Sequence, residues 1–292
     1  MPARDLALLT EAARAAGAVA LSYWKRDPKV WDKGGGAGPV TEADLAVNAL
    51  LEDRLRAARP DYGWLSEETA DSAARLDCNR VFIIDPIDGT RAFVAGEAHF
   101  AHALAVAERG RVVAGVVFLP ALGVLYAAAE GGPALRDGLP IRASERTETA
   151  GATVLTTAPN MSADQWPGGV PDLKRSFRAS LAWRLCLVAE GRHDTLVTFR
   201  NCWEWDIAAG ALIAERAGAV VSDGQGAVLR FNTDPPQAAG LLVGPPGLHR
   251  DLIRPSAFSA VRSAWRCRLR RPSARQACAS AFPRRPPCRH AT

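Results

Sequence analysis

The sequence lacks any run of about 20 consecutive apolar residues, the length that a membrane-spanning helix needs. Its longest uncharged stretch, 112–129, contains Gly, Pro and Tyr at a spacing typical of strands. The first residues carry Asp5, Glu11 and Arg14 inside their apolar pattern, so they are not expected to form a secretory signal. These absences argue against a membrane partner and predict a cytoplasmic location.

Cysteine is also scarce, with six among 292 residues, and no two of them form a C-x-x-C pair. A structural zinc site is therefore not expected, and in a reducing compartment these residues should be free thiols. The remaining composition, 48% hydrophobic and 23% charged, is average for globular proteins and excludes a long coiled coil or a largely disordered chain. A chain of this length can form one or two domains with a substantial core.

Acidic residues are absent from 254–292, a segment that holds ten Arg, five Pro and three Cys. Removing those ten from the 36 Lys and Arg leaves 26 basic against 31 acidic residues in 1–253, which argues against nucleic-acid binding by that part. We predict a folded domain over 1–253 and a disordered Arg/Pro/Cys-rich tail over 254–292. Two alternatives stay open for the tail: anion binding by counterion release, or out-of-frame translation of a GC-rich gene.

Hydrophobic periodicity predicts helices and strands that mix without a repeating βαβ order, which favours α+β layers over a barrel. Thr41 and Asp44 stand in a capping-box relation at the start of one helix. The buried stripe of that helix is expected to comprise Val47, Leu51, Leu55 and Ala58. The other expected helices cover 6–24, 181–191 and 206–217, and the expected strands cover 81–84, 101–108, 111–119, 123–128, 195–199 and 219–222.

The strongest chemical signal is the segment Asp85-Pro86-Ile87-Asp88-Gly89-Thr90, which follows the strand expected at 81–84. A strand that ends here delivers two carboxylates three positions apart, and Pro86 and Gly89 shape the backbone so that these can converge. Mg²⁺ typically takes one or two carboxylates and keeps water ligands near a phosphate. If a helix starts at Gly89 and Thr90, their N–H groups would face an anion. An acidic turn that caps a helix is the alternative interpretation of this motif alone.

Two further acidic segments, Ser66-Glu67-Glu68-Thr69 and Trp203-Glu204-Trp205-Asp206, strengthen the metal hypothesis. Asp206 is expected at a helix start, where capping alone could explain it, and Glu67 and Glu68 could be solvated surface charges. Together these carboxylates suit a phosphoryl-transfer site with two or three metal ions. The D-x-x-D spacing argues against the D-x-D nucleophile of haloacid-dehalogenase phosphatases.

Four segments, in the right order, make the chain resemble the inositol monophosphatase superfamily, which includes the 3′(2′),5′-bisphosphate nucleotidases. The resemblance spans about residues 6 to 253 and implies an α+β fold layered α-β-α-β-α, a sugar-phosphatase-like sandwich. It also implies a Mg²⁺-dependent, Li⁺-sensitive hydrolase of a small phosphate monoester, and leaves a homodimer open. Ser66, where the family usually has Gly, and the Arg-rich tail depart from the family pattern. The matching segments are Gly38-Pro39-Val40-Thr41-Glu42-Ala43-Asp44, Ser66-Glu67-Glu68-Thr69, Asp85-Pro86-Ile87-Asp88-Gly89-Thr90 and Trp205-Asp206-Ile207-Ala208-Ala209-Gly210.

The resemblance implies a role for each matching residue. Asp44 and Thr90 would form the catalytic pair that takes a proton from the attacking water, and the N–H groups of Gly89 and Thr90 would hold the phosphate. Lys33 would belong to the mobile loop near the third metal position. Two or three Mg²⁺ ions would be held by Glu67 (also counted as catalytic), Asp85, the carbonyl of Ile87, Asp88 and Asp206, with Asp85 bridging two ions.

The substrate stays open between an inositol monophosphate and 3′-phosphoadenosine 5′-phosphate. Arg184 and Arg200 lie in the region that lines the substrate pocket in relatives, and an arginine suits bidentate recognition of a second phosphate. Alternatively both are surface side chains that lie along apolar neighbours. Histidinol phosphate or fructose 1,6-bisphosphate is a further substrate alternative, and an inactive phosphatase-like protein with an anion-binding basic tail is an alternative function. His99 and His102 fall on an expected strand and should pack or meet solvent rather than act in catalysis.

Overall fold

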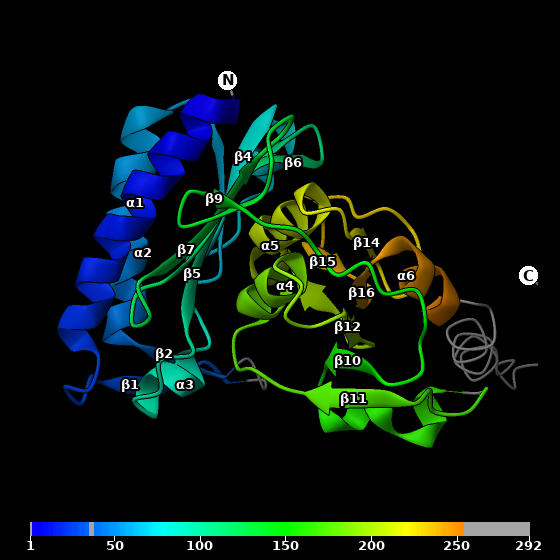
Figure 1. The fold of residues 1–292 in the computed structure, drawn as a ribbon. Helices are drawn as coiled ribbons and strands as arrows, with labels where there is room; N and C mark the ends of the chain where they lie inside the picture. The colour runs from blue at the N-terminus through cyan, green and yellow to red at the C-terminus, as the bar shows by residue number, and fades with distance from the viewer. Residues whose placement is uncertain (1, 35–37, 167, 254–292) are drawn as a thin grey trace, which may run out of the picture.

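The computed structural model describes residues 2–34, 38–166 and 168–253, and Figure 1 shows how their helices and strands are arranged. The tail at 254–292 lies outside the described residues. The helices are α1 (Pro2–Tyr23), α2 (Glu42–Ala58), α3 (Thr90–Val94), α4 (Leu181–Ala189), α5 (Glu204–Arg216) and α6 (Pro246–Leu252). Short 3₁₀ helices cover Ala73–Asp77, Ala158–Met161 and Ala163–Gln165.

The strands form two main sheets and two small ribbons. The first sheet has the order β3 (Gly63–Ser66), β4 (Arg80–Asp88), β5 (Ala101–Glu108), β6 (Arg111–Leu119), β7 (Val124–Ala129), β8 (Leu135–Arg136) and β9 (Leu139–Pro140). The second sheet has the order β11 (Leu173–Ser176), β10 (Ala152–Leu155), β12 (Thr195–Thr198), β16 (Leu241–Gly244) and β14 (Val220–Ser222). The ribbons pair β1 (Val30–Asp32) with β2 (Pro39–Thr41) and β13 (Cys202–Trp203) with β15 (Gln237–Ala238).

The first sheet is covered by helices on both faces because its strands are apolar on both. Along β4, Phe82 and Ile84 pack against α1 and α2, whereas Val81 and Ile83 pack against the α4–α5 side. This alternation follows from the period of two in a strand. Helices α4 and α5 therefore lie between the two sheets, as the centre of Figure 1 shows.

The second sheet closes the stack on the other side of α4 and α5. Leu155, Leu196 and Val243 face the central helices, whereas Val154 and Leu242 face α6 and the 3₁₀ segments on the outside. The order of layers is therefore helix, sheet, helix, sheet, helix (Figure 1), as the family resemblance implied. In the part of the chain that the structure describes, no helix is both long enough and apolar enough to span a membrane.

Most elements begin and end within a few residues of the sequence-based prediction, but three details were wrong. Strand β4 does not end before Asp85: it runs through Pro86 to Asp88, with an irregular register between Asp85 and Asp88. A proline can lie within a strand at such a bulge because no ladder hydrogen bond needs its missing N–H.

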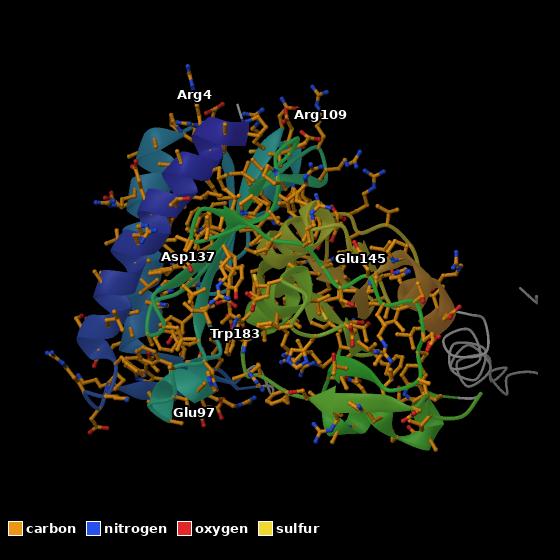
Figure 2. The ribbon with its side chains drawn as sticks, viewed as in Figure 1. Arg4, Glu97, Arg109, Asp137, Glu145 and Trp183 are labelled. Atoms are coloured by element: carbon orange, nitrogen blue, oxygen red, sulfur yellow. The ribbon has the colours of Figure 1, made fainter. Side chains whose placement is uncertain are left out.

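The other two differences concern single residues. Ala58, expected in the buried stripe of α2, is exposed at the end of that helix. His99 precedes β5 rather than lying on it, and its ring packs against Trp183, with centroids 5.1 Å apart. Trp183 lies in the first turn of α4 and is labelled near the centre of Figure 2. His102 does lie on β5 and is fully buried.

Candidate metal and phosphate site

The end of β4 and the first turn of α3 form the floor of the site. Gly89 joins them with φ of 100°, a left-handed conformation that favours glycine. A Cβ atom at this position would lie 3.1 Å from the carbonyl oxygen of His99. The carbonyl of Gly89 accepts from the N–H groups of Ala92 and Phe93, so the N–H groups of Gly89 and Thr90 precede the first hydrogen-bonded turn and can face an anion.

Three of the predicted metal ligands meet in space. One carboxylate oxygen from each of Asp85, Asp88 and Asp206 lies within 4.8 Å of the other two. Asp206 is the third residue of α5, which begins two residues earlier than predicted. Asp85 is only 1% exposed, and its Oδ1 atom has no hydrogen-bond partner among the described residues. A buried carboxylate oxygen without a donor fits a cation site, because such an atom is otherwise costly to bury.

The negative charges of these carboxylates repel one another. Burial raises the pKa of Asp85 and Asp206 well above the usual range, and the neighbouring carboxylates raise both further. Burial also raises the pKa of Asp88 to about 6. Two hydrogen bonds oppose that rise: Ser180 Oγ and the N–H group of Ala182 donate to Asp88 Oδ2 at 2.7 and 2.6 Å. A divalent cation would relieve the repulsion, so the residues present fit the metal that the motifs predict.

Asp44 and Thr90 form the pair that the sequence predicted. The Thr90 Oγ1 atom lies 3.1 Å from Asp44 Oδ1 and 3.1 Å from the carbonyl oxygen of Ile87, and its single proton can go to either acceptor. Asp44 Oδ2 accepts from the backbone N–H and the hydroxyl of Thr41 at 2.8 and 2.6 Å. The capping box of α2 therefore fixes the orientation of Asp44. Burial raises the pKa of Asp44 despite these hydrogen bonds.

Glu67 lies beside the three clustered carboxylates rather than among them. Its Oε1 atom is 2.7 Å from Lys33 Nζ, and Glu68 Oε1 is 2.6 Å from the same ammonium group. The alternative that Glu68 is a solvated surface charge is wrong, because its side chain is 5% exposed. Burial raises the pKa of Glu68 to about 7, although Lys33 opposes the rise. The β1–β2 ribbon thus places a positive charge at the edge of the acidic site.

The two candidate substrate arginines differ in burial. Arg200 is exposed, whereas Arg184 is 4% exposed, so the surface alternative is wrong for Arg184. The Arg184 guanidinium lies over the Phe177 ring, 4.8 Å from its centroid, and donates to the carbonyl of Ala179 at 3.2 Å. Its Nε atom is buried without a partner among the described residues. Burial lowers the pKa of Arg184, while nearby Asp88 and Asp206 raise it, so this side chain lies close to the acidic cluster.

Sequence reasoning missed Ser180 and the N–H group of Ala182, which hold Asp88. Ser180 is the N-cap residue of α4, and its Oγ accepts from the N–H of Trp183 at 2.9 Å while it donates to Asp88. A serine before an apolar helix signals a cap, but the pairing with Asp88, 92 positions away, is visible only in the folded chain. The start of α4 therefore anchors the end of β4 through Asp88.

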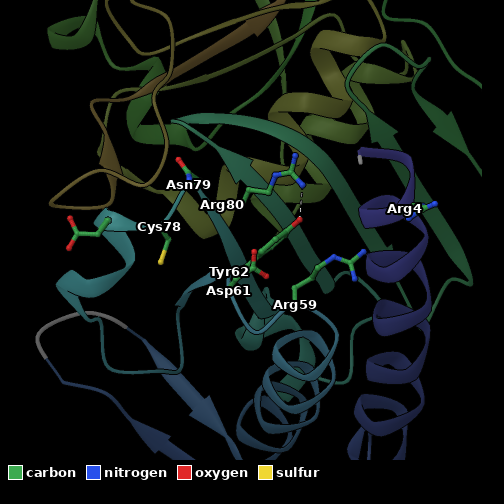
Figure 3. Close-up of a pocket in the computed structure, with 8 residues that line it drawn as sticks. Arg4, Arg59, Asp61, Tyr62, Cys78, Asn79 and Arg80 are labelled. Carbon is green, nitrogen blue, oxygen red and sulfur yellow. Dashed lines mark hydrogen bonds between the residues drawn. The ribbon is translucent and has the colours of Figure 1, made fainter.

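A separate cavity of about 740 Å³ lies at the opposite end of β4 and is shown in Figure 3. Two of its arginines are already paired: Arg59 and Arg80 lie 3.1 and 3.5 Å from the buried carboxylate of Asp5. Because this cavity lies at the start of β4 and the acidic cluster at its end, the cavity is not part of the candidate site. It is lined by Arg4, Arg59, Asp61, Tyr62, Asp77, Cys78, Asn79 and Arg80.

Replacing Asp85 by Asn should raise the melting temperature of the metal-free protein, and the gain should grow from pH 5 to pH 8. Because burial raises the pKa of Asp85, the folded state keeps protons that the unfolded state releases, so wild-type stability falls as pH rises through the raised pKa. The variant lacks this contribution, while the contributions of the buried histidines are common to both proteins. Thermal melts in EDTA at several pH values measure the difference. A gain in melting temperature that shrinks as pH rises would contradict the raised pKa of Asp85 in a buried carboxylate cluster.

Comparisons with known proteins agree with this arrangement. The sequence profile of the inositol monophosphatase family matches residues 2–259. The chain is 34% identical over 196 residues to the 3′(2′),5′-bisphosphate nucleotidase CysQ of Salmonella typhimurium, covering 66% of this chain and 79% of the relative. It is 35% identical over 229 residues to the histidinol-phosphatase of Chlorobaculum parvum, covering 76% and 86%. Among solved structures, the Thermotoga maritima IMPase superposes with a TM-score of 0.74 at 28% identity, covering 90% of this chain and 99% of that one.

Proposed function

The chain belongs to the inositol monophosphatase family and is a phosphatase of small phosphorylated metabolites, and we propose that it works with Mg²⁺ held by its acidic cluster. The observation that carries the proposal is the meeting of Asp85, Asp88 and Asp206 within 4.8 Å. The carbonyl of Ile87 and the carboxylate of Glu67 would complete the ligand set for two or three ions. We propose that this catalytic domain spans residues 1–253.

The residues around the cluster suggest how the reaction proceeds. When bound, Mg²⁺ would supply Lewis-acid chemistry, polarising the phosphoryl oxygens and making a nearby water more acidic. Asp44 would accept the proton of the attacking water through the hydroxyl of Thr90, 3.1 Å from Asp44 Oδ1. The N–H groups of Gly89 and Thr90 would hold the phosphate, and the fixed capping box keeps Asp44 in position.

The substrate class is proposed to be a bisphosphorylated nucleotide, 3′-phosphoadenosine 5′-phosphate, rather than a singly phosphorylated inositol. Arg184 supports this choice, because its guanidinium is buried near Asp88 and its Nε atom, which has no partner within the described ranges, can donate to a second phosphate group. The nucleotidase relative supports it as well. Histidinol phosphate is the second candidate, and the 35% identity to a histidinol-phosphatase favours it.

A phosphate-release screen with Mg²⁺ tests the proposed function. The substrates are 3′-phosphoadenosine 5′-phosphate, inositol monophosphate, histidinol phosphate and fructose 1,6-bisphosphate. The proposal expects the highest kcat/KM for 3′-phosphoadenosine 5′-phosphate. No release from any of these esters would contradict the proposed activity, and a higher kcat/KM for inositol monophosphate or histidinol phosphate would contradict only the substrate choice.

Replacing Arg184 by Ala should lower kcat/KM for 3′-phosphoadenosine 5′-phosphate by about 10- to 100-fold, because a buried charged hydrogen bond contributes about 1.5–3 kcal/mol. The value for inositol monophosphate should change less than threefold, since this substrate has no second phosphate. Arg192→Ala, which removes an exposed guanidinium paired with Glu190, is the matched control and should leave both values unchanged. An equal loss of kcat/KM on both substrates would show that Arg184 does not discriminate between them.

We also propose a cytoplasmic location. The free thiols of Cys78, Cys186 and Cys202 support a reducing compartment. Two of these cysteines are buried in the core around α4 and α5, where they pack as small apolar side chains.

A further inference from the structure

His102 lies directly beneath the acidic loop and contributes to none of the roles described above. It is a fully buried residue of β5, and its Nδ1 atom is hydrogen-bonded to the carbonyl oxygen of Pro86. Because a carbonyl only accepts, Nδ1 must carry the proton and donate. The other ring nitrogen, Nε2, is buried and has no partner among the described residues, which suits the unprotonated nitrogen of a neutral ring.

The register of β4 against β5 explains why Pro86 needs a side-chain donor. Asp85 pairs with Ala103 and Asp88 pairs with Ala101, so three steps along β4 match two steps along β5. The peptide between Pro86 and Ile87 therefore falls out of the regular ladder, as in a β-bulge. Pro86 is buried, and a buried carbonyl without a ladder partner needs another donor. His102, the residue of β5 between the two pairs, supplies it.

Packing alone does not require an imidazole at this position. The residues that share this face of β5, Leu104 and Val106, are aliphatic and belong to the core under α1 and α2. An aliphatic side chain at position 102 would fill that core equally well but would leave the Pro86 carbonyl unpaired. The hydrogen bond, not the volume of the ring, is what distinguishes His102 from its neighbours.

We propose that His102 is a positioning residue for the metal site: its hydrogen bond to Pro86 fixes the bulge that aims Asp85, the Ile87 carbonyl and Asp88 at one point. This inference rests on the proposed Mg²⁺-dependent function. It extends that function by one residue that touches neither metal nor substrate. Removing a residue that orients metal ligands through hydrogen bonds typically lowers metal affinity 10- to 100-fold.

The test compares two substitutions of similar shape in the full chain. His102→Asn keeps an N–H donor at the place of Nδ1, whereas His102→Leu fills the space without a donor. Titration calorimetry of the metal-free proteins with MgCl₂ should give a dissociation constant about tenfold or more higher for the Leu variant, and within about threefold of wild type for the Asn variant. Val106→Ala, a core truncation on the same face of β5, controls for lost stability and should bind Mg²⁺ as wild type does.

Each outcome of the titration decides the inference. The inference would be overturned if His102→Leu bound Mg²⁺ with wild-type affinity, or if His102→Asn bound Mg²⁺ as weakly as His102→Leu. It would also be overturned if Val106→Ala lost as much Mg²⁺ affinity as His102→Leu. Failure of the wild type itself to bind Mg²⁺ would overturn the proposed function instead. If the Leu variant does not fold, ¹⁵N NMR of histidine-labelled wild-type protein decides: the His102 ring should carry its proton on Nδ1 and shift when Mg²⁺ is added. A proton on Nε2, or a ring that does not respond to Mg²⁺, would overturn the role of His102.

Discussion

Replacing Asp85 by Asn should reduce phosphate release by about a thousandfold or more while the fold stays intact. Asp85 belongs to the acidic cluster, and its Oδ1 atom has no hydrogen-bond partner in the part of the chain that the structure describes. A metal ion contributes several kcal/mol of transition-state stabilisation, and each 1.36 kcal/mol is a factor of ten in rate. The amide removes one negative charge from the ligand set but keeps the size of the side chain. Steady-state phosphate release in saturating Mg²⁺ gives the ratio of kcat values.

The control for this substitution is Asp53→Asn, which changes an exposed carboxylate on α2. It should keep wild-type activity. Circular dichroism and thermal melts in EDTA should show that the Asp85 variant is folded and at least as stable as the wild type. A folded Asp85→Asn variant with activity within tenfold of wild type would mean that the cluster does not hold the catalytic metal.

Removing the hydroxyl of Thr90 should produce the second large effect, a fall in kcat of about 10²- to 10⁴-fold, the usual range for a lost general acid–base function. Valine has nearly the shape of threonine but cannot link the attacking water to Asp44, 3.1 Å away in the wild type. The backbone N–H of residue 90 remains in Thr90→Val, so phosphate binding and KM should change little. Initial rates over a range of substrate concentrations separate kcat from KM.

Two companion variants sharpen this experiment. Thr90→Ser keeps the hydroxyl and should recover most of the activity. Thr10→Val removes a hydroxyl that donates to the carbonyl of Leu6 within α1 and should leave the rate unchanged. Calorimetric Mg²⁺ affinity should be the same for wild type and Thr90→Val. A loss that appears only in KM, or that Thr90→Ser does not repair, would contradict the role of this hydroxyl.

Local sequence rules predicted those parts of the site that neighbouring residues determine. Thr41 and Asp44 are three positions apart, so their capping box follows from the geometry of one helical turn. Gly89 was expected at the tight turn because few other residues adopt a left-handed backbone, and its φ is 100°. The family motifs extended the prediction to Asp206, which lies more than a hundred residues from Asp85 in sequence but next to it in space.

What the sequence could not predict depends on contacts between distant segments. The strand expected to end at Ile84 continues to Asp88 because β5 lies alongside it and His102 satisfies the carbonyl of Pro86. Adjacent glutamates are usually solvated, yet the side chain of Glu68 is only 5% exposed, because the β1–β2 ribbon brings Lys33 against it. The burial of Arg184 likewise depends on Phe177 and on the packing of α4 against the first sheet. No local period encodes such pairings.

The three clustered carboxylates meet at an electrostatic cost. Asp85, Asp88 and Asp206 are drawn from β4 and α5, and their mutual repulsion is only partly balanced by Lys33 and Arg184 at the edges. A protein that buries unbalanced carboxylates loses stability unless a cation binds them. The metal-free protein should therefore be less stable than the protein with Mg²⁺, by an amount set by the affinity of the ions.

The most direct test of this account is the rate of phosphate release from 3′-phosphoadenosine 5′-phosphate as Mg²⁺ is returned to protein stripped of metal. The account predicts no measurable release in EDTA, followed by a saturable rise with Mg²⁺ concentration. A rate that is already maximal in EDTA and indifferent to added Mg²⁺ would contradict it.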